Sequence, residues 1–187
     1  MRLSILFAAL LALSACSKND AIGAKELSDA FSFDPELTAT DGSAVTKARF
    51  QGRRSIVYFG FANCPDVCPT AIARLTAALD ILDGKPAYDA YFITVDPERD
   101  TVEALQGYLA FDDRLTGVSG DPEKVRALLD AMHVYAKREE LPDSAIGYTM
   151  AHSSLFYVID DAGEPTFAIT DALTPDQLAE TLRALAK

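Results

Sequence analysis

The sequence has few cysteines, few histidines and few basic residues. It contains three cysteines, two histidines and no tryptophan, and 28 aspartates and glutamates outnumber its 17 lysines and arginines, which gives a net charge of −11. So acidic a chain lacks the basic surface by which proteins bind nucleic acids or anionic membranes, and we expect no nucleic-acid partner. It also lacks internal repeats and low-complexity tracts. The length of 187 residues suits one domain with a hydrophobic core, behind a short N-terminal segment.

The apolar run at the N-terminus is too short for a comfortable membrane span and is typical of an export signal. Arg2 precedes this run, which extends from Leu3 to Leu13 and ends in small residues. The residues Leu13-Ser14-Ala15-Cys16 resemble a bacterial lipobox, in which the cysteine becomes the lipid-modified first residue. We therefore expect a signal peptide over residues 1–15 and lipidation of Cys16. The alternative is an ordinary signal peptide that leaves Cys16 as a spare thiol.

Export and lipidation predict the location of the rest of the chain. Residues 16–34 are polar and lack a regular apolar pattern, so we expect a lipidated N-terminus and a tether there, with the folded domain over residues 35–187. The domain is then expected in the periplasm or on the extracytoplasmic face, anchored to the membrane by lipid alone. The sequence leaves open which membrane carries the anchor.

Beyond residue 35 the apolar pattern alternates between strand and helix. Short β-prone runs around Asp41-Gly42 predict a β-hairpin, and the apolar run from Ser55 to Phe61 suits a strand buried on both faces. Further strands are expected at 90–95, 116–119, 133–137, 155–159 and 165–169, and helices from 69 to 84, at 101–111, from 121 and from 174. This order predicts an α/β protein with a mixed central sheet flanked by helices and an N-terminal β-hairpin, which fits a thioredoxin-like fold.

The stretch FGFANCPDVCPT, from Phe59 to Thr70, places Cys64 and Cys68 between a buried strand and a helix. Open α/β sheets bind their ligands at this position, and the helix N-terminus stabilises a thiolate there. Pro69 disfavours a helical conformation at Cys68, so we expect the helix to begin at about Pro69 and both cysteines to lie on a loop. In an oxidising compartment this pair is a structural disulfide, a redox couple or part of a metal site.

Two thiolates form a soft site that selects Cu(I) or Zn²⁺, and a third ligand is most often histidine. The chain offers His133 and His152. His152 lies directly before an apolar strand that the fold places in the central sheet, on the side of the cysteine loop. His133 lies at a helix-to-strand junction, where a structural role is expected. A structural zinc site normally has four protein ligands, whereas only three are evident here.

At these residues the chain resembles the Sco/SenC family of copper-binding proteins, which assist cytochrome c oxidase assembly. The resemblance covers residues 31–186 and rests on FGFANCPDVCPT, on ITVDPERDT from Ile93, on FDDRLTGVSG from Phe111 and on HSSLFYVIDDAG from His152. It implies a thioredoxin-like fold and copper ligands at Cys64, Cys68 and His152. It also implies delivery of copper to the binuclear copper centre of oxidase subunit II, or reduction of that centre's cysteines.

We therefore expect a copper chaperone rather than an enzyme, with oxidase subunit II or another copper acceptor as its partner. A periplasmic copper donor or a thiol reductase would act before it. The alternative is a thiol-disulfide oxidoreductase that uses Cys64 and Cys68 as a redox disulfide. Asp66 and Asp96 are candidates for residues that surround the ligands. Asp66 is alternatively a weak extra oxygen ligand or an acceptor that orders the loop backbone, and Asp96 is alternatively a turn former before Pro97.

Overall fold

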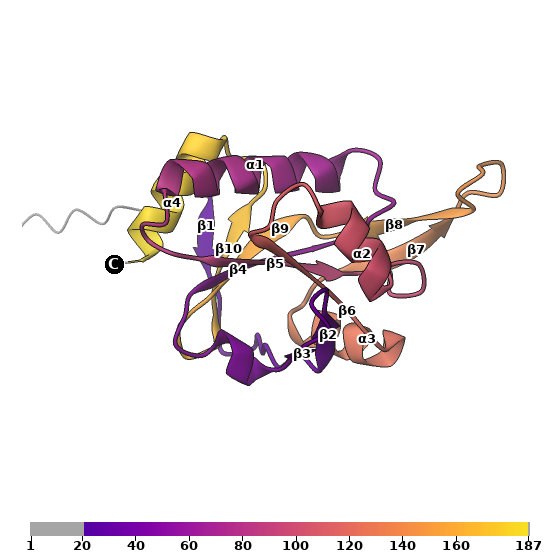
Figure 1. Ribbon diagram of the computed structural model, residues 1–187, viewed down its shortest axis with the longest axis horizontal. Helices are drawn as coiled ribbons and strands as arrows, with labels where there is room; N and C mark the ends of the chain where they lie inside the picture. The colour runs from indigo at the N-terminus through magenta and orange to yellow at the C-terminus, as the bar shows by residue number, and fades with distance from the viewer. Residues whose placement is uncertain (1–20, 187) are drawn as a thin grey trace, which may run out of the picture.

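The computed structural model describes residues 21–186. The expected signal peptide, Cys16 and the first residues of the tether lie outside this range. Within it, the centre is an eight-stranded sheet in the order β1-β10-β9-β4-β5-β6-β2-β3, seen nearly edge-on in Figure 1. The strands are β1 (Ala24–Glu26), β2 (Leu37–Ala39), β3 (Ala44–Val45), β4 (Ser55–Gly60), β5 (Asp89–Thr94), β6 (Leu115–Ser119), β9 (Leu155–Ile159) and β10 (Pro165–Thr170).

The sheet is mixed, as expected. Strands β4, β5 and β6 are parallel, whereas β9 is antiparallel to β4 and β10 is antiparallel to β9. The predicted hairpin around Asp41-Gly42 is formed by β2 and β3, and β2 extends the sheet beyond β6. The parallel strands end at the same edge of the sheet, so the loop after β4 and the loop after β5 lie next to each other there.

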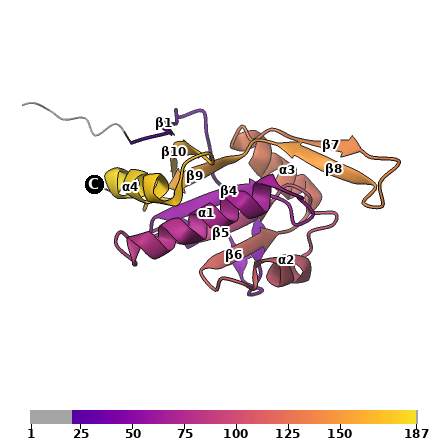
Figure 2. The same cartoon turned by 90° about the horizontal axis from the view of Figure 1, so that it is seen from above.

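Helices cover both faces of the sheet. Helices α1 (Val67–Leu82) and α4 (Pro175–Leu185) pack side by side on one face (Figures 1 and 2), and α3 (Pro122–Ala131) lies on the other. Helix α2 (Val102–Leu109) packs beside β6, and a 3₁₀ turn, η1, spans Lys47–Phe50. All six residues of β4 are buried, because both of its faces are covered. The α/β class with helices flanking the sheet is confirmed.

Local capping signals were reliable predictors of helix starts. The Thr101 side chain accepts the Ala104 N–H, and the Asp121 side chain accepts the first N–H groups of α3. Thr174 and Gln177 form the predicted capping box of α4. In each case a side-chain oxygen satisfies N–H groups that have no partner inside the helix.

The folded part begins before residue 35, earlier than the sequence predicted. Strand β1 pairs antiparallel with β10, and the Phe33 side chain is fully buried with its ring centroid 4.7 Å from that of Phe50. The physical reason is that β10 would otherwise expose an unpaired edge, which β1 covers. Residues 24–34 therefore belong to the domain rather than to a tether.

The strand expected at 133–137 begins later, because the chain first completes a turn at the end of α3. The N–H of His133 donates to Asp130 O and the N–H of Val134 donates to Leu129 O, while His133 has a φ of +48°. Strand β7 (Ala136–Glu140) pairs with β8 (Tyr148–His152). The sequence did not predict a strand at the position of β8. These two strands form a separate hairpin that projects from the body of the molecule (Figures 1 and 2). No helix within residues 21–186 is long and apolar enough to cross a membrane.

Candidate metal centre

Three separate elements bring Cys64, Cys68 and His152 together. Cys64 lies on the loop after β4, Cys68 lies in the first turn of α1, and His152 is the last residue of β8. The two sulfurs and one imidazole nitrogen all lie within 4.8 Å of one another. Ligands placed about 2.0–2.3 Å from a single ion stand roughly 3.5–4 Å apart around it. The three side chains therefore fit one metal ion with a small closing movement.

Helix α1 begins at Val67, two residues before the predicted start at Pro69. Cys68 is consequently helical, so the expectation that both cysteines lie on a loop is wrong for this one. The first helical N–H groups have no partner inside a helix, so the missing N–H of Pro69 costs no hydrogen bond. The Thr70 N–H donates to Asp66 O in the first turn. The Cys68 N–H, at the positive end of the helix dipole, donates to Cys64 Sγ.

A hydrogen bond of Nδ1 orients the His152 imidazole ring, so that its other nitrogen, Nε2, is free to bind a metal. Nδ1 lies 2.9 Å from the backbone oxygen of Ser153. A carbonyl oxygen only accepts, so Nδ1 carries the proton and Nε2 presents a lone pair, 3.4 Å from Cys68 Sγ. The rings of Tyr58 and Phe61 pack edge-on against the imidazole, with centroids at 6.3 and 5.7 Å. The ring is therefore held with its free nitrogen toward the thiols.

The two thiols differ in environment. Cys64 is half-buried, and hydrogen bonds from the Cys68 side chain and from the backbone N–H groups of Cys68 and Asp66 lower the pKa of its thiol. The Cys68 N–H lies 3.3 Å from Cys64 Sγ. The hydrogen bond to Cys64, together with burial, raises the pKa of the Cys68 thiol. The pair thus holds one half-buried thiolate and one buried thiol.

This donor set suits a soft metal ion that is exchanged rather than kept. Two sulfurs and one imidazole nitrogen favour Cu(I) or Zn²⁺, and three protein ligands leave a position open for a ligand from another molecule. Cys64 and His152 are half-exposed, whereas Cys68 is buried. An approaching molecule therefore reaches Cys64 and His152 first.

Of the two acidic candidates, neither carboxylate has a hydrogen bond to a cysteine or to His152. Asp66 is exposed at the N-cap of α1 and approaches Cys64 through its backbone N–H. Asp96 is buried and accepts the Tyr148 hydroxyl at 2.8 Å and Arg99 Nε at 2.5 Å. Asp96 thus contacts the β7–β8 hairpin rather than the ligands.

Asp100, which no sequence pattern singled out, contacts the cysteine loop directly. Asp100 is fully buried, and its Oδ2 accepts the Ala62 N–H at 3.0 Å and the Thr94 hydroxyl at 2.7 Å. Burial raises the pKa of this carboxyl. The only signal in the sequence was its place in ITVDPERDT, beside Asp96. His133, as expected, is structural: its Nε2 lies 3.2 Å from Ala30 O and its ring packs against Phe31.

Comparison with known proteins agrees with this architecture. The SCO1/SenC family model matches residues 21–187. The mitochondrial SCO1 homolog 1 of Arabidopsis thaliana is 37% identical over 126 residues, which cover 66% of this chain and 37% of that protein. The chain therefore spans well under half the length of this relative.

Two solved structures share the fold. The structure of Bradyrhizobium japonicum ScoI with copper bound has a TM-score of 0.72 and 36% identity, and the match covers 80% of this chain and 95% of that one. Arabidopsis thaliana ScoI with copper bound has a TM-score of 0.75 and 31% identity, covering 81% and 96%. These matches confirm the expected thioredoxin-like fold. Because this family model extends over all of the described residues, the chain belongs to the SCO1/SenC family.

Proposed function

We propose that this chain is a copper chaperone that holds copper through Cys64 Sγ, Cys68 Sγ and His152 Nε2. The observation that carries the proposal is the approach of these three atoms to within 4.8 Å of one another. The copper bound in the Bradyrhizobium and Arabidopsis relatives supports the choice of metal. Copper is cargo here rather than a resident cofactor, so binding and release both matter.

The unequal exposure of the ligands favours transfer by ligand exchange. The buried Cys68 binds the ion on the side of the protein interior, while Cys64 and His152 lie closer to the surface. An acceptor's ligand can enter the open coordination position and displace His152, the neutral ligand, before either sulfur leaves. A low coordination number thus allows release without unfolding of the site.

The copper acceptor in this proposal is the binuclear centre of cytochrome c oxidase subunit II, the role implied by the Sco/SenC resemblance. A periplasmic copper donor or a thiol reductase prepares the chaperone for its cargo. Export through residues 1–15 and lipidation of Cys16, both outside the described residues, would hold the domain at the extracytoplasmic face of the membrane. The acidic charge disfavours nucleic acid as a partner.

A second candidate function, thiol-disulfide exchange, is favoured by the difference between the two thiols. The Cys64 thiolate can attack a target disulfide, which forms a mixed disulfide and releases one target thiolate. Cys68, after losing its proton, then attacks Cys64 Sγ, so that the target leaves fully reduced and a Cys64–Cys68 disulfide remains. An external thiol must reduce this disulfide before another turnover. His152 has no necessary part in these steps.

Anaerobic titration with Cu(I) against a competing chelator distinguishes the two functions. The reduced chain from residue 17 onward is expected to bind one equivalent, and His152→Ala is expected to weaken binding by at least about tenfold. His133→Ala is the matched control and should leave the affinity unchanged. Binding no stronger than to an exposed dithiol, with no effect of His152→Ala, would reject the chaperone and favour thiol exchange.

A further inference from the structure

The hairpin that carries His152 is not part of the central sheet. Strands β7 and β8 pair only with each other, with Ala136 opposite His152 and Glu140 opposite Tyr148. A two-stranded hairpin has little stability of its own. The contacts that join it to the body therefore determine where the imidazole of His152 lies.

One of these contacts is a stack of two arginines on Tyr148: Arg99 belongs to the segment after β5, and Arg138 belongs to β7 of the hairpin itself. The guanidinium carbon of Arg99 lies 3.5 Å from the ring centroid, and that of Arg138 lies 3.7 Å from it. Two guanidinium groups this close to one centroid must occupy opposite faces of the ring, because one face has room for only one. The Tyr148 ring is 8% exposed and is thus enclosed between two cations.

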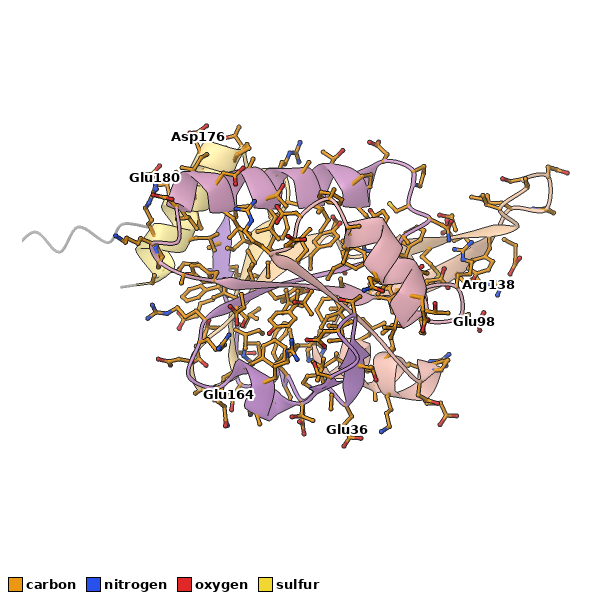
Figure 3. The ribbon with its side chains drawn as sticks, viewed as in Figure 1. Glu36, Glu98, Arg138, Glu164, Asp176 and Glu180 are labelled. Carbon is orange, nitrogen blue, oxygen red and sulfur yellow. The ribbon has the colours of Figure 1, made fainter. Side chains whose placement is uncertain are left out.

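Each arginine also ties the hairpin to the segment 96–100, which follows β5. Arg99 donates from Nη1 to Tyr148 O at 3.0 Å, and the Tyr148 hydroxyl donates to Asp96 at 2.8 Å. Arg138 lies 3.3 Å from Glu98, and Figure 3 labels both residues at the end where the hairpin projects. The hairpin is therefore held by stacking, by a buried hydrogen bond and by one charge pair, all from a single short segment.

The same segment holds the cysteine loop from the other side. Asp100 accepts the N–H of Ala62, two residues before Cys64. Its backbone N–H donates to Asp96 O at 2.9 Å, so the residue that holds the cysteine loop is bonded directly to the residue that holds Tyr148. Five consecutive residues that contain no metal ligand thus join the cysteine loop to the hairpin, in addition to the contacts that the imidazole itself makes.

We propose that Arg99, Tyr148 and Arg138 are positioning residues that place His152 over the two cysteines. This proposal rests on the copper function proposed above, and it adds residues that touch neither the metal nor a ligand. Loss of the stack releases the hairpin, which withdraws the imidazole while the two sulfurs stay in place. The expected defect is therefore confined to the contribution of His152.

The test uses Tyr148→Leu and Arg138→Ala in the reduced protein, with Arg126→Ala as the matched control. Arg126 is an exposed arginine of α3 without a salt bridge among residues 21–186. Each of the two stack variants is expected to weaken Cu(I) binding about 10- to 100-fold, the range typical of outer contacts to a metal site. In a His152→Ala background the same changes should have no further effect. An equal loss in both backgrounds would overturn the proposal.

A metal-free measurement separates this proposal from the copper function. In the apo protein the ring protons of His152 experience the edge-on rings of Tyr58 and Phe61, so their NMR shifts differ from those of a free histidine. The stack variants are expected to move these shifts toward the free values while the rest of the NMR spectrum stays that of the folded protein, and Arg126→Ala is not expected to move them. Unmoved shifts overturn the positioning role, even if copper binds. Moved shifts with no effect of His152→Ala on copper affinity reject the ligand set and leave the positioning role standing.

Discussion

The Nε2 atom of His152 lies 3.4 Å from Cys68 Sγ, although 84 residues separate them in the chain. Neither residue is near the other in any local element: one begins a helix and the other ends a hairpin strand. The contact gives the buried thiol a nitrogen neighbour with a free lone pair. It adds a nitrogen atom to the two sulfurs, so that three potential metal-binding atoms lie together.

The first prediction concerns the ionisation of the thiols. Because hydrogen bonds lower the pKa of Cys64 while burial and Cys64 itself raise that of Cys68, the reduced protein should hold one thiolate at about pH 7, where an ordinary thiol is protonated. Ultraviolet thiolate absorbance followed during a pH titration measures this. Cys64→Ser should abolish the low-pH step. Cys68→Ala should shift it upward, because the thiol of Cys68 is the main donor to Cys64 and alanine has no donor. Two thiolates titrating together near the ordinary value would contradict the assignment.

The lowered pKa of Cys64 also predicts how stability depends on pH. Ionisation of this thiol stabilises the folded state fully when the pH is above the thiol's pKa in the unfolded state, about 8.5. This contribution is lost as the pH falls through its lower pKa in the folded state. The free energy of unfolding of the reduced protein, relative to Cys64→Ser, should therefore decrease on acidification. Urea denaturation at a series of pH values provides the measurement, and a constant difference would contradict it.

Asp100 should show the opposite dependence. Burial raises the pKa of Asp100 in the folded state. Its contribution to stability is therefore fully present below the pKa of the unfolded state, about 3.9, and is lost as the pH rises through the pKa of the folded state. Asp100→Asn keeps one oxygen for the Ala62 and Thr94 hydrogen bonds and does not titrate. The wild type should lose stability relative to this variant between acidic and neutral pH. Parallel stability curves for the two proteins would show that the carboxyl does not titrate in this range.

Gly60 ends β4 directly before the cysteine loop, and a side chain there has no room. A Cβ atom would lie 2.8 Å from the Tyr58 ring and 2.9 Å from the Phe92 ring. Gly60→Ala should therefore destabilise the protein by about 1–3 kcal/mol through overpacking. Gly107→Ala is the control, because no atom lies within 4 Å of its added Cβ and alanine favours the helix. Chemical denaturation of both variants checks the prediction, which fails if the two behave alike.

Oxidation should remove metal binding reversibly. A disulfide between Cys64 and Cys68 removes two of the three proposed ligands, so that only His152 remains. The oxidised protein is expected to bind Cu(I) no better than the double serine variant, and reduction should restore the affinity. Titration before and after reduction measures this, and equal affinity in the two states would mean that copper binds elsewhere.

The sequence by itself determined the features that depend on nearby residues. The cap residues Asp121 and Thr174 start their helices as predicted, because a cap bonds only to the next turn. The apolar run at β4 was sufficient to place a strand buried on both faces. The spacing of Cys64 and Cys68 after this strand, and the place of His152 before another, predicted three side chains that the fold does bring together.

Tertiary structure decided the features that depend on residues far apart in the chain. Strand β1 forms because the edge of β10 needs a partner. Helix α1 begins at Val67, although a residue that precedes a proline, here Cys68, prefers an extended conformation. The choice of Asp100 over Asp96 as the contact to the cysteine loop follows from adjacent parallel strands that end at one edge. A hydrogen bond or a stack between distant segments leaves no periodic pattern in the sequence. Its energy appears only when the packed chain removes both groups from water.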